Sequence, residues 1–212
     1  MASAVIHLAV AKVLEPYLKI TNKKDYYLGS IAPDIAKQIG ESKQKSHFLY
    51  NERKDVPNMK MFTDKYPNFY KNDFDLGYYI HLFTDKLWFD KFLNNLVQSN
   101  SVKLIDGTIL NTTPEELRNL IYTDYTNLNI KIIEEYNMDL SLFYEEFQKP
   151  NTTIDEIPIN KLNILINKMG VIIENSKQEK NYVFDIYLVK QFIEDTKERI
   201  LQEIKDYECV TS

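Results

Sequence analysis

Residues 75–98 read DLGYYIHLFTDKLWFDKFLNNLVQ, and this stretch decides the fold. Its apolar residues recur every three or four positions, a spacing that predicts one long helix. One stripe along that helix is plain core and consists of Leu76, Ile80, Phe83 and Leu87. A second apolar stripe lies beside it, so a wide face of the helix must pack against other elements. We therefore expect it to form the buried centre of a helical bundle.

The second stripe places a histidine and a carboxylate in an aromatic wall: Tyr78, His81, Asp85, Trp88 and Phe92. Residues four apart on a helix lie about 5–6 Å apart at their Cβ atoms. His81 and Asp85 can therefore bind one metal ion, or Asp85 can simply accept a hydrogen bond from the imidazole. Both groups need such a partner, because an unpaired buried carboxylate is costly. Taken alone, the pair does not distinguish a metal site from an internal hydrogen bond.

The segments on either side of this helix predict further helices. Thr113 as N-cap, Pro114 at the first helical position and acidic residues in the first turn mark one helix start. That helix should run to about residue 136. Other helices are expected over residues 4–19, 139–148, 161–178 and 183–207, and residues 37–72 should be mostly loop with short helical turns. The prediction is one all-α domain over residues 1–212, a multi-helix bundle with a sub-bundle boundary at 149–160.

The composition excludes several classes of protein. The 212 residues carry 26 Lys and Arg against 31 Asp and Glu, a net charge of −5, which argues against a stable nucleic-acid complex. Few glycines (5) and prolines (7) disfavour a turn-rich β fold, and the single cysteine cannot form an intramolecular disulfide. No apolar run is long enough for a transmembrane segment, and the opening MASAVIHLAVAKVL lacks a basic leader region. We therefore expect a cytoplasmic protein.

Three more polar residues stand in unusual surroundings. His7 faces the apolar stripe of the first predicted helix, and His47 lies where the polar KSHF segment (45–48) turns apolar. Asp34 ends the segment GSIAPD (29–34). Each has an ordinary structural explanation when taken singly, namely a core histidine, a loop histidine and a turn-capping aspartate.

Taken in order, these elements resemble the bacterial zinc-dependent phospholipase C family, which is related to the P1-type zinc nucleases. The resemblance covers about residues 1–95. It implies an all-α protein that hydrolyses phosphate esters at a cluster of zinc ions bound by His and Asp. The ligands it implies here are His7, Asp34, His47, His81 and Asp85. By the same resemblance Asp85 bridges two ions, and Asp34 doubles as the catalytic base or water-orienting group.

The chain departs from this family in two ways. Family members use a further His, His and Glu after the helical motif, whereas no histidine follows His81 here. Secreted members also use a processed N-terminal residue as a ligand, whereas this sequence starts at Met1. We therefore expect a reduced site of one or two ions. Asp124, in YTDY (122–125), is either a replacement ligand or a helix residue with an ordinary hydrogen bond.

Three imidazoles and two carboxylates suit zinc, and iron or manganese would also fit. A shared carboxylate can hold two ions about 3.5–4 Å apart, the spacing of hydrolytic two-metal sites. The expected function is a metal-dependent hydrolase of a small phosphoester or a phospholipid. One alternative is an HD-type phosphohydrolase, although the chain contains no His-Asp dipeptide. Another is a non-catalytic helical binding protein with a structural metal or none, which would lack an open coordination position.

Overall fold

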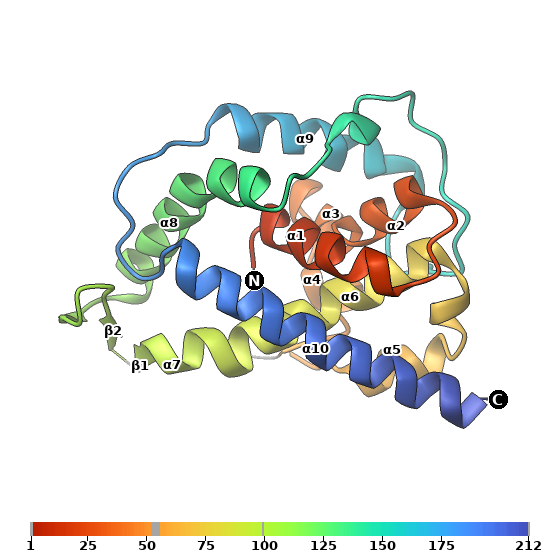
Figure 1. Ribbon diagram of the computed structural model, residues 1–212, viewed down its shortest axis with the longest axis horizontal. Coiled ribbons are helices and arrows are strands. Elements are labelled where there is room, and N and C mark those ends of the chain that lie inside the picture. Colours follow the sequence, from red (N-terminus) through yellow and green to blue (C-terminus); the bar gives the residue numbers. More distant parts are fainter. Residues whose placement is uncertain (1, 52–55, 99, 212) are drawn as a thin grey trace.

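Helices dominate the computed structural model, which describes residues 2–51, 56–98 and 100–211 (Figure 1). The predicted all-α class is confirmed. The α-helices in these ranges are α1 Ala4–Leu14, α2 Lys23–Gly29, α3 Ile35–Gln38, α4 Lys43–Ser46, α5 Met59–Lys65, α6 Asp73–Leu87, α7 Asn94–Leu96, α8 Pro114–Glu135, α9 Leu162–Glu174 and α10 Ile186–Thr211. The 3-10 segments are Glu15–Tyr17, Ala32–Asp34, Phe69–Lys71, Ser141–Phe143 and Ile159–Lys161.

The long helix expected over residues 75–98 is present as α6, a π-helical segment Trp88–Leu93 and α7. It begins two residues earlier than predicted because Asn72 is the N-cap, its side chain accepting the N–H of Asp75. From Phe74 to Leu87 every side chain except Lys86 is buried. The prediction of a buried central helix is therefore confirmed.

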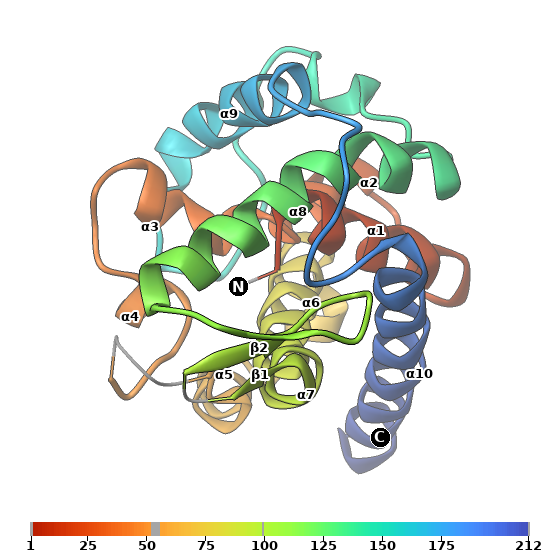
Figure 2. The ribbon, with the colours of Figure 1, turned by 90° about the vertical axis from the view of Figure 1, so that its left-hand side faces the viewer.

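α1 lies beside α6 near the middle of the bundle. It contacts α2, α6, α8 and α10, and Figures 1 and 2 show these helices around it. All residues from Val5 to Ala11 are buried, because this helix is apolar around nearly its whole circumference. The helix ends at Leu14, earlier than the predicted residue 19, since Pro16 lacks the N–H that would continue the hydrogen-bond ladder.

α2 and α6 cross with their backbones in direct contact, and glycine makes this possible on both sides. A Cβ atom added to Gly77 would lie 2.1 Å from the carbonyl oxygen of Tyr26. One added to Gly29 would lie 2.1 Å from the carbonyl oxygen of Phe74. This close crossing brings Ser30, which follows α2, against His81 of α6.

α8 begins as predicted, with a complete capping box. The Thr113 side chain accepts the N–H of Glu116, and the Glu116 carboxylate accepts the N–H of Thr113. The prediction of a helix over residues 139–148 is wrong, because only the 3-10 turn Ser141–Phe143 forms there. α9 and α10 match the two helices expected at the end of the chain.

A small antiparallel sheet between α7 and α8 was not predicted. Its strands are β1 Val97–Gln98, β2 Ser101–Lys103 and β3 Ile109–Asn111, in the order β1-β2-β3. β1 pairs with β2 in the register Val97↔Val102, and β2 pairs with β3 in the register Val102↔Leu110. Strands of two or three residues are too short to show the alternation of apolar and polar residues by which strands are recognised.

The connection at residues 149–160, predicted as a sub-bundle boundary, packs onto the central helix. Thr152 and Thr153 donate their hydroxyl hydrogens to the buried carboxylate of Asp75, and Ile154 and Ile157 are buried. The hydrophobic core is one continuous cluster that extends from α1 to α10. Across the described ranges of the chain, no helix combines the length and apolar character needed to cross a membrane.

Trp88, the only tryptophan, reports directly on this core. Its side chain is fully buried, and the centroid of its ring lies 4.2 Å from that of Phe92 and 4.8 Å from that of Phe192. We expect a blue-shifted fluorescence emission that acrylamide quenches poorly. An emission maximum typical of tryptophan in water would contradict the placement of this helix at the centre of the bundle.

Candidate metal centre

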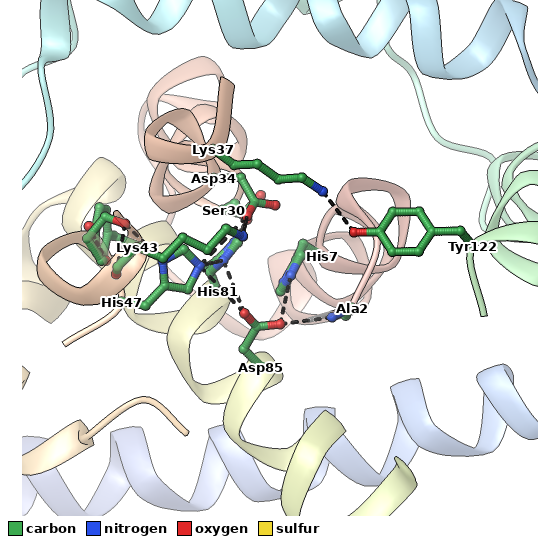
Figure 3. A network of polar contacts seen from close by, with 12 residues as sticks. Ala2, His7, Ser30, Asp34, Lys37, Lys43, His47, His81, Asp85 and Tyr122 are labelled. Atoms are coloured by element: carbon green, nitrogen blue, oxygen red, sulfur yellow. Dashed lines mark hydrogen bonds and ion pairs between the residues drawn. The ribbon is translucent and has the colours of Figure 1, made fainter. Parts of the chain in front are cut away.

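The structure brings all five predicted ligands together (Figure 3). His7 comes from α1, Asp34 ends the 3-10 turn after α2, and His47 follows α4. His81 and Asp85 lie one turn apart on α6. All five residues are buried. Segments up to 78 positions apart in the sequence therefore meet at one polar cluster inside an apolar core.

The distances within the cluster are those of ligands around an ion. His47 Nε2 lies 3.3 Å from His81 Nε2 and 3.6 Å from Asp85 Oδ2. His81 Nε2 lies 3.7 Å from Asp85 Oδ2. Ligand atoms about 2.1 Å from one tetrahedral ion would lie about 3.4 Å from one another. The ligand atoms fall into two overlapping groups, and within each group they lie no more than 4.8 Å apart. One group contains His7, Asp34 and His81, and the other contains His47, His81 and Asp85.

A hydrogen bond outside the cluster fixes the tautomer of His81, and a second one is compatible with the same tautomer in His47. His81 Nδ1 lies 2.9 Å from the carbonyl oxygen of Ser30 and must donate to it, because a carbonyl only accepts. His47 Nδ1 lies 2.9 Å from Ser46 Oγ, which donates its own hydrogen to the carbonyl of Lys43. His81 Nε2 therefore directs a lone pair into the cluster, and His47 Nε2 can do the same. This is the arrangement that metal-binding histidines adopt.

His7 contributes atoms that have no hydrogen-bond partner in the part of the chain that the structure describes. Both of its ring nitrogens are buried; Nδ1 has no polar contact among the described residues, whereas Nε2 makes no hydrogen bond but lies 3.3 Å from Asp85 Oδ1, and Asp85 Oδ2 has no hydrogen-bond partner. The His7 ring stacks on that of His81 with centroids 3.7 Å apart. Buried polar atoms are almost always hydrogen-bonded, so unpartnered ones need an explanation such as an ion. A cation at this position would supply the missing partner, and the residues present therefore fit a metal.

The two oxygens of Asp85 face different parts of the cluster. Oδ1 lies 3.3 Å from His7 Nε2 and accepts the backbone N–H of Ala2 at 2.9 Å. Oδ2 faces His47 and His81. Burial would raise the pKa of Asp85, but the interaction with His7 opposes it, and that pKa lies well below its usual value. An ionised carboxylate with this orientation suits the bridging role that the family resemblance implies.

Asp34 lies at the edge of the cluster and is paired with Lys43, whose Nζ lies 2.8 Å from Asp34 Oδ1. His47 Nε2 lies 3.7 Å from the same oxygen. Burial would raise the pKa of Asp34, but the positive charge of Lys43 opposes it, and the pKa lies well below the ordinary value. Asp34 is therefore ionised at neutral pH, as a ligand must be.

His47 stays inside the cluster because the chain reverses immediately after it. Phe48 has a φ of 53°, in the left-handed region that residues other than glycine rarely adopt. Its ring is buried and lies 5.3 Å from that of Phe62, and this packing offsets the backbone strain. Tyr78 of α6 also donates a hydrogen bond to the carbonyl of Ser46.

Burial also favours the neutral forms of His47 and His81. It lowers the pKa of His47 to about 4, with the positive charge of Lys43 as the next cause. Burial, and then His7, hold the pKa of His81 well below its usual value. Neutral imidazoles are the form that binds metal, so His47 and His81 can bind a cation at physiological pH.

The same shifts predict that the metal-free protein loses stability in mild acid. Between an unfolded pKa of about 6.5 and the folded value of about 4, the unfolded chain binds more protons at His47 than the folded protein does. The free energy of unfolding should therefore fall as the pH falls through this window, by up to about 1.4 kcal/mol per pH unit for each such histidine. Urea denaturation of chelator-treated protein from pH 7.5 to 4.5 measures the slope, and His47→Gln should reduce it. A slope unchanged in that variant would contradict the shift.

Asp124 does not join the cluster. Its carboxylate accepts backbone N–H groups from Tyr182, Val183 and Phe184 instead. It therefore anchors the segment before α10 to α8, which is the ordinary structural alternative raised for this residue. The sequence reasoning missed Lys43 and the supporting groups of Ser30 and Ser46. Only the position of Ser46 next to His47 offered any sign of its role.

Comparison of the chain with family models, curated proteins and solved structures finds no match. The resemblance of residues 1–95 to the zinc-dependent phospholipase C family therefore stays a prediction, and the function is inferred from the geometry of the site.

Proposed function

We propose that the protein is a metal-dependent hydrolase of phosphate esters, with His7, Asp34, His47, His81 and Asp85 as the metal ligands. One observation carries the proposal. His47 Nε2 and His81 Nε2 lie 3.3 Å apart, beside a buried carboxylate oxygen that has no hydrogen-bond partner among the described residues. A cation between these atoms would supply the partner that this oxygen lacks.

The donor set supports zinc first, with iron and manganese as alternatives. Neutral imidazole and carboxylate oxygen are common zinc ligands, and both are available here. Five side chains are more than one tetrahedral ion needs, so the set supports either one ion with extra ligands or two ions that share Asp85. Two zinc ions would leave a net positive charge after Asp34 and Asp85 are counted, which favours an anionic substrate such as a phosphoester.

When bound, zinc lowers the pKa of a coordinated water and polarises a phosphoryl oxygen. The protein residues supply the remaining requirements. Asp34 lies where the cluster meets a cavity, so its ionised carboxylate is placed to orient a water by accepting its hydrogen bond. The ion pair with Lys43 holds that carboxylate in place.

Access distinguishes a catalytic from a purely structural site. Structural zinc sites are closed, whereas catalytic sites keep a position open to substrate. Asp34 lines a cavity of about 220 Å³ that is also lined by Lys37 and Lys168. A cavity with lysines in its lining, next to Asp34 at one edge of the cluster, favours hydrolysis over the alternative of a non-catalytic binding protein with a structural metal.

Metal analysis combined with a turnover assay tests the proposal. Protein purified without chelators should contain one or two equivalents of zinc, iron or manganese by elemental analysis. It should hydrolyse a chromogenic phosphate mono- or diester, lose this activity with a chelator and regain it when metal is restored. Bound metal without turnover of either ester would reject the hydrolase and favour the structural-metal alternative.

A further inference from the structure

The cavity next to Asp34 has walls from four parts of the fold. They are the residues that begin α1, the α3 segment, one side of α8 and one side of α9. Its volume is about 220 Å³. This is less than the roughly 300–1,000 Å³ of pockets that enclose drug-sized ligands. The cavity therefore suits a small molecule, and the acyl chains of a phospholipid are too large to lie inside it.

The charge of the cavity is opposite to that of the protein as a whole. Among its described lining residues Asp34 is the only acid, whereas Lys37 and Lys168 are both present, in a chain with a net charge of −5. Lys37 is held in place, because its Nζ donates to the hydroxyl of Tyr122 at 2.8 Å and lies 5.0 Å from the centre of that ring (Figure 3). This local positive charge favours an anionic ligand.

Asn129 gives this cavity an acceptor that requires a hydrogen-bond donor. It lines the wall on α8, the residue is 4% exposed, and its buried Oδ1 atom has no hydrogen-bond partner in the described chain. A buried amide oxygen of this kind is normally satisfied by a donor. A ligand hydroxyl or amino group would satisfy it. Leu165 and Ile172 of α9 form an apolar wall in the same cavity.

We propose that this cavity binds the alcohol part of the substrate, and that the substrate is a small water-soluble phosphoester whose alcohol carries a hydroxyl or amino group. The donor binds Asn129 Oδ1, and the negative charge is compensated by Lys37 and Lys168. The phosphate lies at the Asp34 end, next to the metal cluster. The inference rests on the proposed function for the reaction itself, but the recognition of the ligand can be measured without turnover.

Two phosphonates that resist hydrolysis make a matched pair of probes. Both 3,4-dihydroxybutylphosphonate and butylphosphonate carry the same anionic group, and only the first offers hydroxyl donors. Isothermal titration calorimetry on the zinc-loaded protein should show about tenfold tighter binding of the diol, which corresponds to about 1.4 kcal/mol. Asn129→Leu removes the acceptor with little change in size and should abolish this preference.

Separate variants serve as the controls for the charge of the cavity and for folding. Lys168→Gln should weaken the binding of both phosphonates several-fold, whereas Lys161→Gln, an exposed lysine outside the cavity, should leave both unchanged. Circular dichroism and thermal unfolding show whether Asn129→Leu is folded. If it is not, Lys168→Gln still tests the cavity, because Lys168 is exposed and its substitution should not disturb the fold. Equal binding of the two probes to the wild type, or an unchanged preference in Asn129→Leu, would overturn the proposal. So would tighter binding of a short-chain phospholipid.

The two proposals fail in different ways. Zinc-dependent turnover of a chromogenic ester without any preference for the diol would overturn the substrate class and leave the hydrolase intact. A preference for the diol that depends on Asn129, in a protein that hydrolyses no phosphoester, would support the binding cavity and reject the hydrolase.

Discussion

Asp85→Asn is expected to remove bound metal and to reduce phosphoester hydrolysis by at least about 100-fold. Loss of a group that merely supports a ligand already costs about 10–100-fold in metal affinity or activity, and in the proposed site Asp85 is itself a ligand. Its two oxygens face His7 on one side and His47 and His81 on the other. The substitution removes negative charge from both sides at once. His47→Ala should have a smaller effect, because it removes one neutral ligand.

Asp124→Asn is the matched control for this experiment. Asp124 is also buried, but its carboxylate binds three backbone N–H groups outside the cluster. It should lower thermal stability and leave the metal content per folded molecule unchanged. Elemental analysis, turnover and circular dichroism are measured on all the variants. Full metal content and turnover in Asp85→Asn would contradict its role as a ligand.

The parts of the fold that the sequence predicted are those with a strong local cause. α8 has a complete capping box within four residues, and α6 has an apolar spacing that repeats over several turns. His7, His81 and Asp85 stood out because they lie on apolar stripes of predicted helices, and the full set of five was predicted from the resemblance of the ordered motifs to the zinc-dependent phospholipase C family. The number of ions and the reaction stay predictions, because neither the geometry of the side chains nor the comparisons decide them.

The parts that were not predicted depend on packing between distant segments. Lys43 pairs with Asp34 only because the turn after α2 and α4 meet in the fold. The carbonyl of Ser30 fixes the tautomer of His81 across 51 positions of sequence. The cavity that holds Asn129 needs α3, α8 and α9 together. No pattern within one segment contains this information.

Gly77→Ala is expected to destabilise the bundle strongly, although it adds only one methyl group. The added Cβ would lie 2.1 Å from the carbonyl oxygen of Tyr26 and 2.8 Å from the backbone nitrogen of Ser30. Overpacking usually costs about 1–3 kcal/mol, and a clash with backbone atoms cannot be relieved by rotating a side chain, so we expect about 3 kcal/mol or more. In a chain of this length that lowers the melting temperature by about 6–12 °C.

Gly170→Ala separates this clash from the general effect of removing a helical glycine. A Cβ atom at Gly170 of α9 would meet nothing within 4 Å, so the alanine should stabilise the protein by about 0.5–1 kcal/mol. Gly77→Ala should also lower metal affinity, since separating α6 from α2 moves His81 away from the carbonyl of Ser30 that fixes its tautomer. Thermal unfolding and metal titration of the two variants measure both effects. If Gly77→Ala kept the wild-type melting temperature and metal affinity, the close crossing of α2 and α6 would not be what positions the metal ligands.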